Sequence, residues 1–249
     1  RIDSLSDEIP HPIAATMDQE EVAYIFRREG LASAPVVDDD NRLIGVITID
    51  DIVDVIDEEA QEDLLRLGGV EQGDLYNAVI GTTRSRFRWL FINLFTAIFA
   101  SIVISLFDAT LEEIVALAIL MPIVASMGGN AGTQALTVAV RAIATKELSA
   151  ANQWRLIWKE ALVGVLNGLA FAVISCLIAG LWFNDPVLGA VIGLAMVINL
   201  VVAGLCGAGI PVILDRLGSD PAVSSTVVLT TITDVVGFFA FLGIAAIAM

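Results

Sequence analysis

The chain has 249 residues, of which 57% are hydrophobic, and it carries a formal net charge of −16. This charge is concentrated in residues 1–83, which hold 20 acidic and five basic side chains, whereas residues 84–249 hold nine acidic and eight basic ones. The sequence therefore predicts an acidic, water-soluble part followed by a nearly neutral membrane part. An acidic surface repels nucleic acid and attracts cations, so we expect no nucleic-acid partner.

The first part of the chain has the pattern of a small α+β domain. Asp18 followed by Glu21 predicts a capped helix start, and Gly30 predicts the helix end. Two β-type runs and a second helix are expected to follow, at Ala34–Val37, at Leu43–Thr48 and from about Asp50.

This second helix is unusually acidic and has no basic residue before Arg66. Like charges four residues apart destabilise a helix, and hard divalent cations would relieve the repulsion because they take oxygen ligands. An ordinary solvated acidic face explains the same pattern, so both interpretations stay open. The acids concerned are Asp50, Asp51, Asp54, Asp57, Glu58, Glu59, Glu62 and Asp63.

The second part contains five apolar runs that are long enough to span a bilayer. They are approximately Trp89–Phe107, Ile114–Val140, Ala161–Phe183, Val187–Leu214 and Ala222–Met249. The predicted fold class is an α-helical membrane protein with five transmembrane helices, preceded by the small α+β domain. We expect a multi-pass protein of the cell (inner or plasma) membrane.

The basic residues predict how the spans are oriented. All eight that lie beyond residue 83 precede the first span or fall in the connections after the second and fourth spans. The positive-inside rule then places the N-terminus in the cytoplasm and the C-terminus outside.

Asp234 lies near the middle of the fifth predicted span, about 18 Å deep at ~1.5 Å per residue. A lone carboxylate at that depth costs at least ~2.5 kcal/mol, and no Lys or Arg occurs at depth in any span to offset it. We expect a site for a permeating cation or a proton. A protonated Asp that hydrogen-bonds across helices is the alternative.

The second span contains Pro122 and the glycine-rich run Met127–Gln134, which predict a kinked or broken helix. Neutral oxygens there could bind an ion, and the side chains that carry them are Asn130, Thr133 and Gln134. The alternative is close helix packing through Gly128 and Gly132.

Other polar residues point to no further chemistry. We interpret Asn93 and Asn199 as interhelical hydrogen bonders rather than ligands. The sequence shows no nucleophile–base pair, phosphate-binding loop or Cys/His cluster, so we do not expect an enzyme.

The runs Ala34–Asp38 and Arg42–Val53 resemble the end of a CBS domain. The whole chain resembles the MgtE family of magnesium channels. The resemblance rests on this CBS-like unit, the acidic helix and the five spans, with Gly-Gly-Asn-Ala-Gly-Thr-Gln in the second span and Thr-Asp-Val-Val-Gly in the fifth. The resemblance implies three parts: a CBS domain at 1–57 (second copy of a usual pair), an acidic connecting helix and linker at 58–86, and a five-helix pore domain at 87–249. The family's superhelical N-terminal domain and first CBS copy have no counterpart here.

The resemblance also implies a function and a mechanism. A homodimer in the lipid bilayer would carry Mg²⁺ through a pore where two copies of Asp234 face each other, with a Thr230 carbonyl one turn earlier; Asn130 is the third predicted pore ligand. Cytosolic Mg²⁺ would hold the pore closed by bridging acids, at positions matching Asp51, Asp54, Glu59, Glu62, Asp63 and Asp220. An adenine nucleotide is a candidate partner of the CBS unit. A CBS-regulated transporter of Mn²⁺, Co²⁺ or a proton-coupled solute is the alternative.

Overall fold

The computed structural model describes residues 12–70 and 78–249. The chain forms two compact units, Arg1–Leu65 and Arg66–Met249, and each is described by itself.

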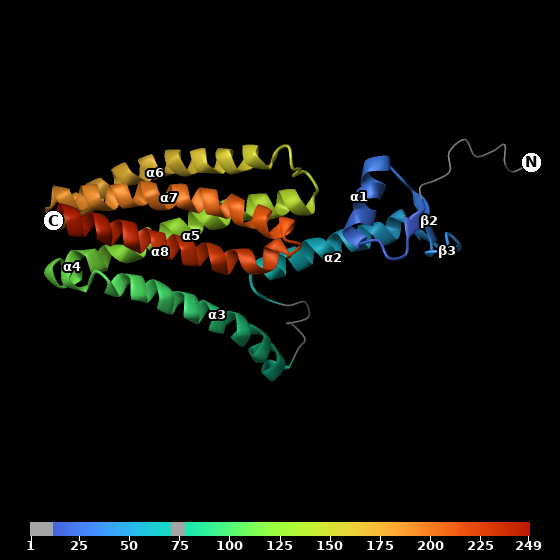
Figure 1. The fold of residues 1–249 in the computed structure, drawn as a ribbon, viewed down its shortest axis with the longest axis horizontal. Helices are drawn as coiled ribbons and strands as arrows, with labels where there is room; N and C mark the ends of the chain where they lie inside the picture. The colour runs from blue at the N-terminus through green and yellow to red at the C-terminus, as the bar shows by residue number, and fades with distance from the viewer. Residues whose placement is uncertain (1–11, 71–77) are drawn as a thin grey trace, which may run out of the picture. The chain divides into compact units, whose positions relative to one another are not determined.

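The first unit contains a three-stranded sheet with the order β1-β2-β3 (Figure 1). Strand β1 pairs parallel to β2, and β2 pairs antiparallel to β3. From residue 12 on, two helices complete the unit, and Phe26 and Ile52 are the largest fully buried side chains of its core. The bounds are β1 Ile13–Ala14, α1 Gln19–Glu29, β2 Ser33–Val37, β3 Leu43–Thr48 and α2 Ile49–Leu67.

The predicted helix signals operate at both ends of α1. The Asp18 side chain accepts a hydrogen bond from the Glu20 N–H at 2.9 Å, as expected of an N-cap. Gly30 ends the helix in the left-handed conformation, with φ of 65°, which costs glycine little because it has no Cβ. The predicted helix and both predicted strands are confirmed, whereas the two-residue strand β1 was not expected.

Among its described residues, the second unit has five helices that are long and apolar enough to cross a membrane. They confirm the predicted α-helical membrane fold with five spans. A short helix that was not expected, α4 (Asp108–Glu113), connects the first two. The long helices are α3 Val79–Ser105, α5 Val115–Ala144, α6 Gln153–Phe183, α7 Pro186–Arg216 and α8 Pro221–Ala248.

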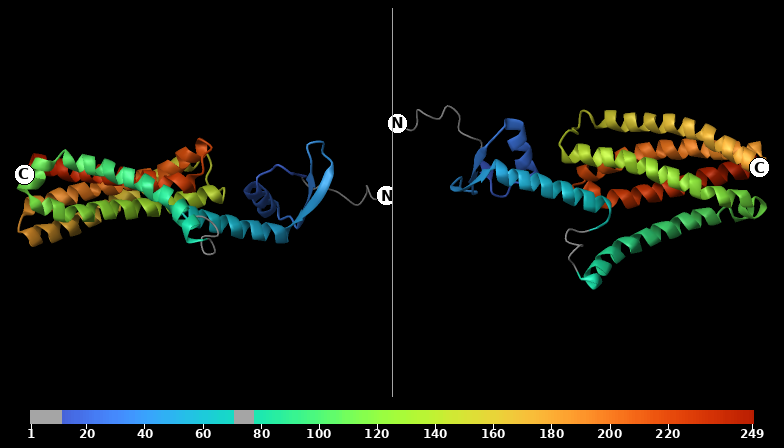
Figure 2. Two further views of the ribbon diagram at one scale, coloured as in Figure 1. Left: turned by 90° about the horizontal axis from the view of Figure 1, so that it is seen from below. Right: turned by 180° about the vertical axis from the view of Figure 1, so that it is seen from behind.

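Helix α7 lies at the centre of this bundle, packed against α5, α6 and α8 (Figures 1 and 2). It is the most deeply buried of the five long helices, and α3, which packs along α8, is the least buried. Glycines bring the helices close together. At Gly164 of α6, for example, a Cβ atom would lie 2.5 Å from the Leu200 carbonyl oxygen of α7.

Helix α5 is continuous from Val115 to Ala144 with Pro122 inside it, so the predicted break in the second span is wrong. A proline removes only one N–H donor, and the helix resumes on both sides of it. The glycines serve packing instead: Gly128 faces Asn199 of α7 and Gly132 faces Leu229 of α8. Close approach through Gly128 and Gly132, the alternative interpretation, is therefore present in the structure.

Candidate functional site

Asp234 lies at the middle of α8, as the 14th of its 28 residues. The neighbouring stripe of the helix, with Leu229, Thr233 and Phe241, is buried against the bundle. Asp234 follows Thr233 of this stripe by one residue, which turns it about 100° around the helix, and its side chain is half buried. The carboxylate therefore lies at mid-span on the edge of the stripe that α8 buries, and not in the interior of the bundle.

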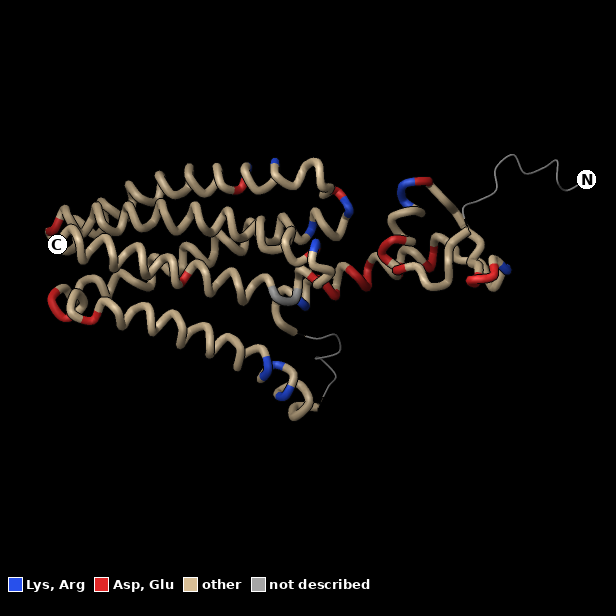
Figure 3. The backbone as a smooth tube through the Cα atoms, in the orientation of Figure 1, with Lys and Arg blue, Asp and Glu red and all other residues tan. Residues whose placement is uncertain are grey.

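No group within residues 12–70 and 78–249 forms a hydrogen bond or an ion pair with the Asp234 carboxylate. Within the membrane bundle the Lys and Arg residues gather toward one end (Figure 3). This distribution follows the predicted segregation of basic residues. The cost of the mid-membrane charge is not offset by any partner in the part of the chain that the structure describes.

The threonines around Asp234 hydrogen-bond to their own helix. Thr230 donates to the Thr226 carbonyl oxygen, and Thr231 donates to the Val227 carbonyl oxygen at 2.7 Å. The Thr233 hydroxyl lies 3.1 Å from the Thr230 carbonyl oxygen, the atom predicted to contact an ion. These hydroxyls use their protons locally and keep oxygen lone pairs for other contacts.

The other two predicted pore residues lie on exposed faces of their helices. Thr230 is exposed on α8, and Asn130 is exposed on α5, where its Nδ2 is 3.4 Å from Ser126 Oγ. Asn130 is two residues from the packed Gly128, which places it about 200° around the helix. In the described residues no three His, Cys, Asp or Glu side chains gather into a metal-binding group. The described part of one chain thus presents separate candidate ligands rather than a closed site.

Asp51 and Glu59, two of the predicted regulatory acids of α2, accept hydrogen bonds from nearby side chains or backbone. The Thr48 N–H and the Thr48 hydroxyl donate to Asp51 Oδ2 at 2.9 and 2.8 Å, and these bonds, the backbone one first, hold the pKa of Asp51 below its ordinary value. Gln19 Nε2 donates to Glu59. The carboxylates of Asp54, Glu62 and Asp63 lie along the same helix.

Asp220, the remaining predicted regulatory acid, caps α8 and is paired with a basic residue. Its Oδ1 accepts from the Ala222 N–H at 2.8 Å, and its Oδ2 forms an ion pair with Arg66 at the end of α2. The adjoining Leu67 packs against Leu136 and Leu229, and its carbonyl oxygen lies 3.4 Å from Thr226 Oγ1. Sequence reasoning missed this role of Arg66, although its position as the first base after the acidic run was a visible signal.

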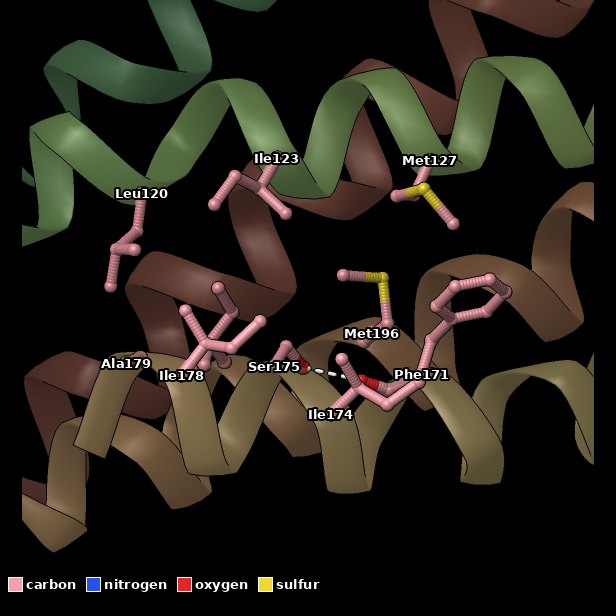
Figure 4. Close-up of a pocket in the computed structure, with 10 residues that line it drawn as sticks. Leu120, Ile123, Met127, Phe171, Ile174, Ser175, Ile178, Ala179 and Met196 are labelled. Atoms are coloured by element: carbon pink, nitrogen blue, oxygen red, sulfur yellow. Dashed lines mark hydrogen bonds between the residues drawn. The ribbon is translucent and has the colours of Figure 1, made fainter. Parts of the chain in front are cut away.

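A pocket of about 110 Å³ lies between α5, α6 and α7 (Figure 4). Leu120, Met127, Phe171 and Met196 line it, and the hydroxyl of Ser175 is already used by the Phe171 carbonyl oxygen at 2.7 Å. Apolar walls cannot replace the water shell of a cation. The lining of this pocket therefore offers a cation no ligands.

Two family models match the chain. Residues 121–244 match MgtE, described as a divalent cation transporter, and residues 4–58 match the CBS domain.

Curated relatives extend the match over most of the chain. Proteins named magnesium transporter MgtE from Enterococcus faecalis, Thermus thermophilus and Bacillus subtilis are 37%, 38% and 34% identical over 93% of the chain. The chain spans about half the length of these relatives, 51–52%.

Proposed function

The chain belongs to the MgtE family of divalent cation transporters, and we propose that it carries Mg²⁺ across the membrane through a path that passes Asp234. The proposal has a chemical basis in the relatives, which are named as magnesium transporters and not as enzymes. It has a physical basis in Asp234, a half-buried carboxylate at mid-span with no partner among the described residues. A charge that costs this much in a bilayer marks an ion pathway.

The chemistry of Mg²⁺ favours a site made by two copies of the chain. Mg²⁺ loses its water reluctantly and is usually held through water by one or two carboxylates. One chain supplies a single carboxylate at this depth, on the edge of α8. In a homodimer, two copies of Asp234 would form a ring of charge that selects cations, with Thr230 and Asn130 adding neutral oxygens from exposed helix faces.

Regulation by cytosolic Mg²⁺ is the second element of the proposal. The acids of α2 and Asp220 would bind Mg²⁺ and hold the pore closed, and their mutual repulsion would open it when Mg²⁺ falls. This requires the N-terminus and α2 to be cytoplasmic, in agreement with the basic end of the bundle (Figure 3). At Asp220 the ion would have to compete with Arg66, which already neutralises that carboxylate.

The test of transport is ion flux through the purified chain in lipid vesicles. We expect Mg²⁺ to enter vesicles that contain the chain, and Mn²⁺ and Co²⁺ supplied separately report how far selectivity extends. Absence of divalent flux would overturn the proposal, and faster flux of Mn²⁺ or Co²⁺ than of Mg²⁺ would replace Mg²⁺ as the substrate.

The paired site has its own test by disulfide cross-linking. Asp234→Cys in a chain whose native Cys176 and Cys206 are changed to Ser should cross-link between copies, or bridge through Cd²⁺. Ile247→Cys, an exposed position near the end of the same helix, is the comparison variant. Equal cross-linking at both positions would contradict a specific pairing at Asp234.

Regulation is tested by proteolysis of α2. Protection of this helix should rise as millimolar Mg²⁺ is added and disappear when the ion is chelated. An unchanged cleavage rate would mean that the acidic helix is only solvated.

A further inference from the structure

Asn199 is a buried amide in the middle of α7, and it is 0% exposed. Its Nδ2 donates a hydrogen bond of 2.9 Å to the Val124 carbonyl oxygen of α5. Its Oδ1 is buried and accepts no hydrogen bond from the part of the chain that the structure describes. An apolar side chain would fill this position without leaving an acceptor unpaired, so packing alone does not account for the amide.

Two glycines on two other helices hold the amide between them. A Cβ atom on Gly128 of α5 would lie 2.2 Å from Asn199 Nδ2, and a Cβ atom on Gly237 of α8 would lie 2.7 Å from the same nitrogen. Both distances are shorter than real Cβ contacts, so a larger residue at either glycine would force Asn199 or the helix to move. Asn199 is therefore the spacer that separates α5 from α8 at this level of the bundle.

The contact between Asn199 and Gly237 lies at the same height in the bundle as Asp234. Gly237 follows Asp234 by three residues on α8, which is about 4.5 Å along the helix axis. The turn of α8 that rests on Asn199 is thus the turn that carries Asp234. The neighbouring Thr233 is fully buried, so this turn has little freedom to shift without moving the whole contact.

We propose that Asn199 is a positioning residue for Asp234: by fixing the spacing of α5 and α8, it sets how the pathway discriminates between divalent cations. This rests on the proposed path of ions past Asp234. Ions such as Mg²⁺ and Co²⁺ differ in how readily they shed water. A small change in the position of the carboxylate should therefore change the ratio of their fluxes, while the bundle still assembles.

The first variant removes the amide and keeps its shape. Asn199→Leu retains branching at Cγ but loses the hydrogen bond to Val124. We expect it to reach the membrane folded and to change the ratio of Co²⁺ to Mg²⁺ flux by about threefold or more, the range typical of groups coupled by direct contact. The control is Gly209→Ala, also on α7, where an added Cβ meets nothing within 4 Å, and its flux ratio should stay at the wild-type value.

The second variant pair tests the contact itself. Gly128→Ala alone should reduce Mg²⁺ flux by roughly tenfold, because the added methyl group collides with Asn199. In the double variant Gly128→Ala/Asn199→Ala the methyl group has room, so Mg²⁺ flux should recover. The flux ratio should stay altered, because the amide that fixes the spacing is gone.

Wild-type flux ratios in both Asn199→Leu and the double variant would overturn the proposal, since Asn199 would then only fasten the bundle. Failure of both to assemble would also overturn it, by making Asn199 a folding residue. Asp234→Asn, measured in the same vesicles, separates the proposed ion path from the proposed role of Asn199. If Asp234→Asn conducts Mg²⁺ like wild type, the path past Asp234 is wrong. If it loses flux while the Asn199 variants keep the wild-type flux ratio, only the positioning role of Asn199 is refuted.

Discussion

Helix α2 carries eight carboxylates, whereas α8, between Pro221 and Ala248, carries one, Asp234. Carboxylates of α2 take part in ordinary surface hydrogen bonds, as Asp51 does with Thr48 and Asp57 does with Gln61 at 2.8 Å. Asp234 has no such partner in the described residues. The same chemical group is therefore used in two different settings.

The comparison shows that the free-energy cost of a carboxylate, which depends on whether it lies in water or in the bilayer, decides how strongly it indicates a function. In water an additional acid on a helix costs a few tenths of a kcal/mol, so eight of them are compatible with a merely solvated face. Inside a bilayer a single charge costs several times as much, so one residue suffices to indicate a function. Both proposed roles need an experiment, but the cost of the charge makes the case for Asp234 the stronger of the two.

The largest effect is expected at Asp234. Asp234→Asn should lower Mg²⁺ flux by about 100-fold, because a charge whose placement costs ~2.5–3.5 kcal/mol is retained for its interaction with the ion. Glu58→Gln on α2 should change maximal flux less than about threefold, as expected of a solvated surface charge. Flux into vesicles measures both.

Glu113→Gln, at an exposed position of α4, is the control for general loss of negative charge. Equal effects of Asp234→Asn and Glu58→Gln would abolish the distinction between the two helices.

A smaller effect is expected where the end of α2 meets α8. Arg66→Gln removes the cation that neutralises Asp220, so Mg²⁺ should inhibit flux at a concentration about threefold lower, the size of a partly exposed ion pair. Asp220→Asn should shift inhibition to higher Mg²⁺. Flux measured at graded cytosolic Mg²⁺ checks both directions.

Arg42→Gln, whose guanidinium is highly exposed and lies 3.5 Å from Asp40, is the matched control. A shift in the same direction for Arg66→Gln and Asp220→Asn would show that Arg66 does not compete with Mg²⁺ for Asp220.

The smallest effect is expected at Asp51. Its pKa is lowered from the ordinary value of 3.8 by the hydrogen bonds from Thr48, so its contribution to stability is present above pH 3.8 and is lost as the pH falls through the lower, folded-state pKa. The Thr48 amide should therefore become less protected from hydrogen exchange in that acidic range. Asp51→Asn should lower the protection at neutral pH and make it less dependent on acid.

Asp39→Asn is the comparison, because Asp39 makes no hydrogen bond to Thr48. Identical acid profiles for wild type and Asp51→Asn would mean that the carboxylate does not support the start of α2.

Much of the fold was predictable because its signals are local. Apolar runs of span length identify the five helices, and capping residues such as Asp18 and Gly30 identify the ends of α1. The boundaries were less accurate: α3 begins at Val79, ten residues before the expected Trp89, because polar and basic residues extend a helix beyond its apolar run. The second span was expected to be kinked or broken, and the break is absent, because Pro122 and the glycines also suit a continuous helix when neighbours pack against them.

The sequence by itself determined that Asp234 lies at mid-membrane without a basic residue at its depth, because hydropathy and the cost of burying charge depend on position along the chain. Only the tertiary structure decided which groups meet across helices. Asn199 separates Gly128 from Gly237, and Arg66 pairs with Asp220, 154 residues further along. Such contacts depend on the rotation and spacing of packed helices, which no local pattern encodes.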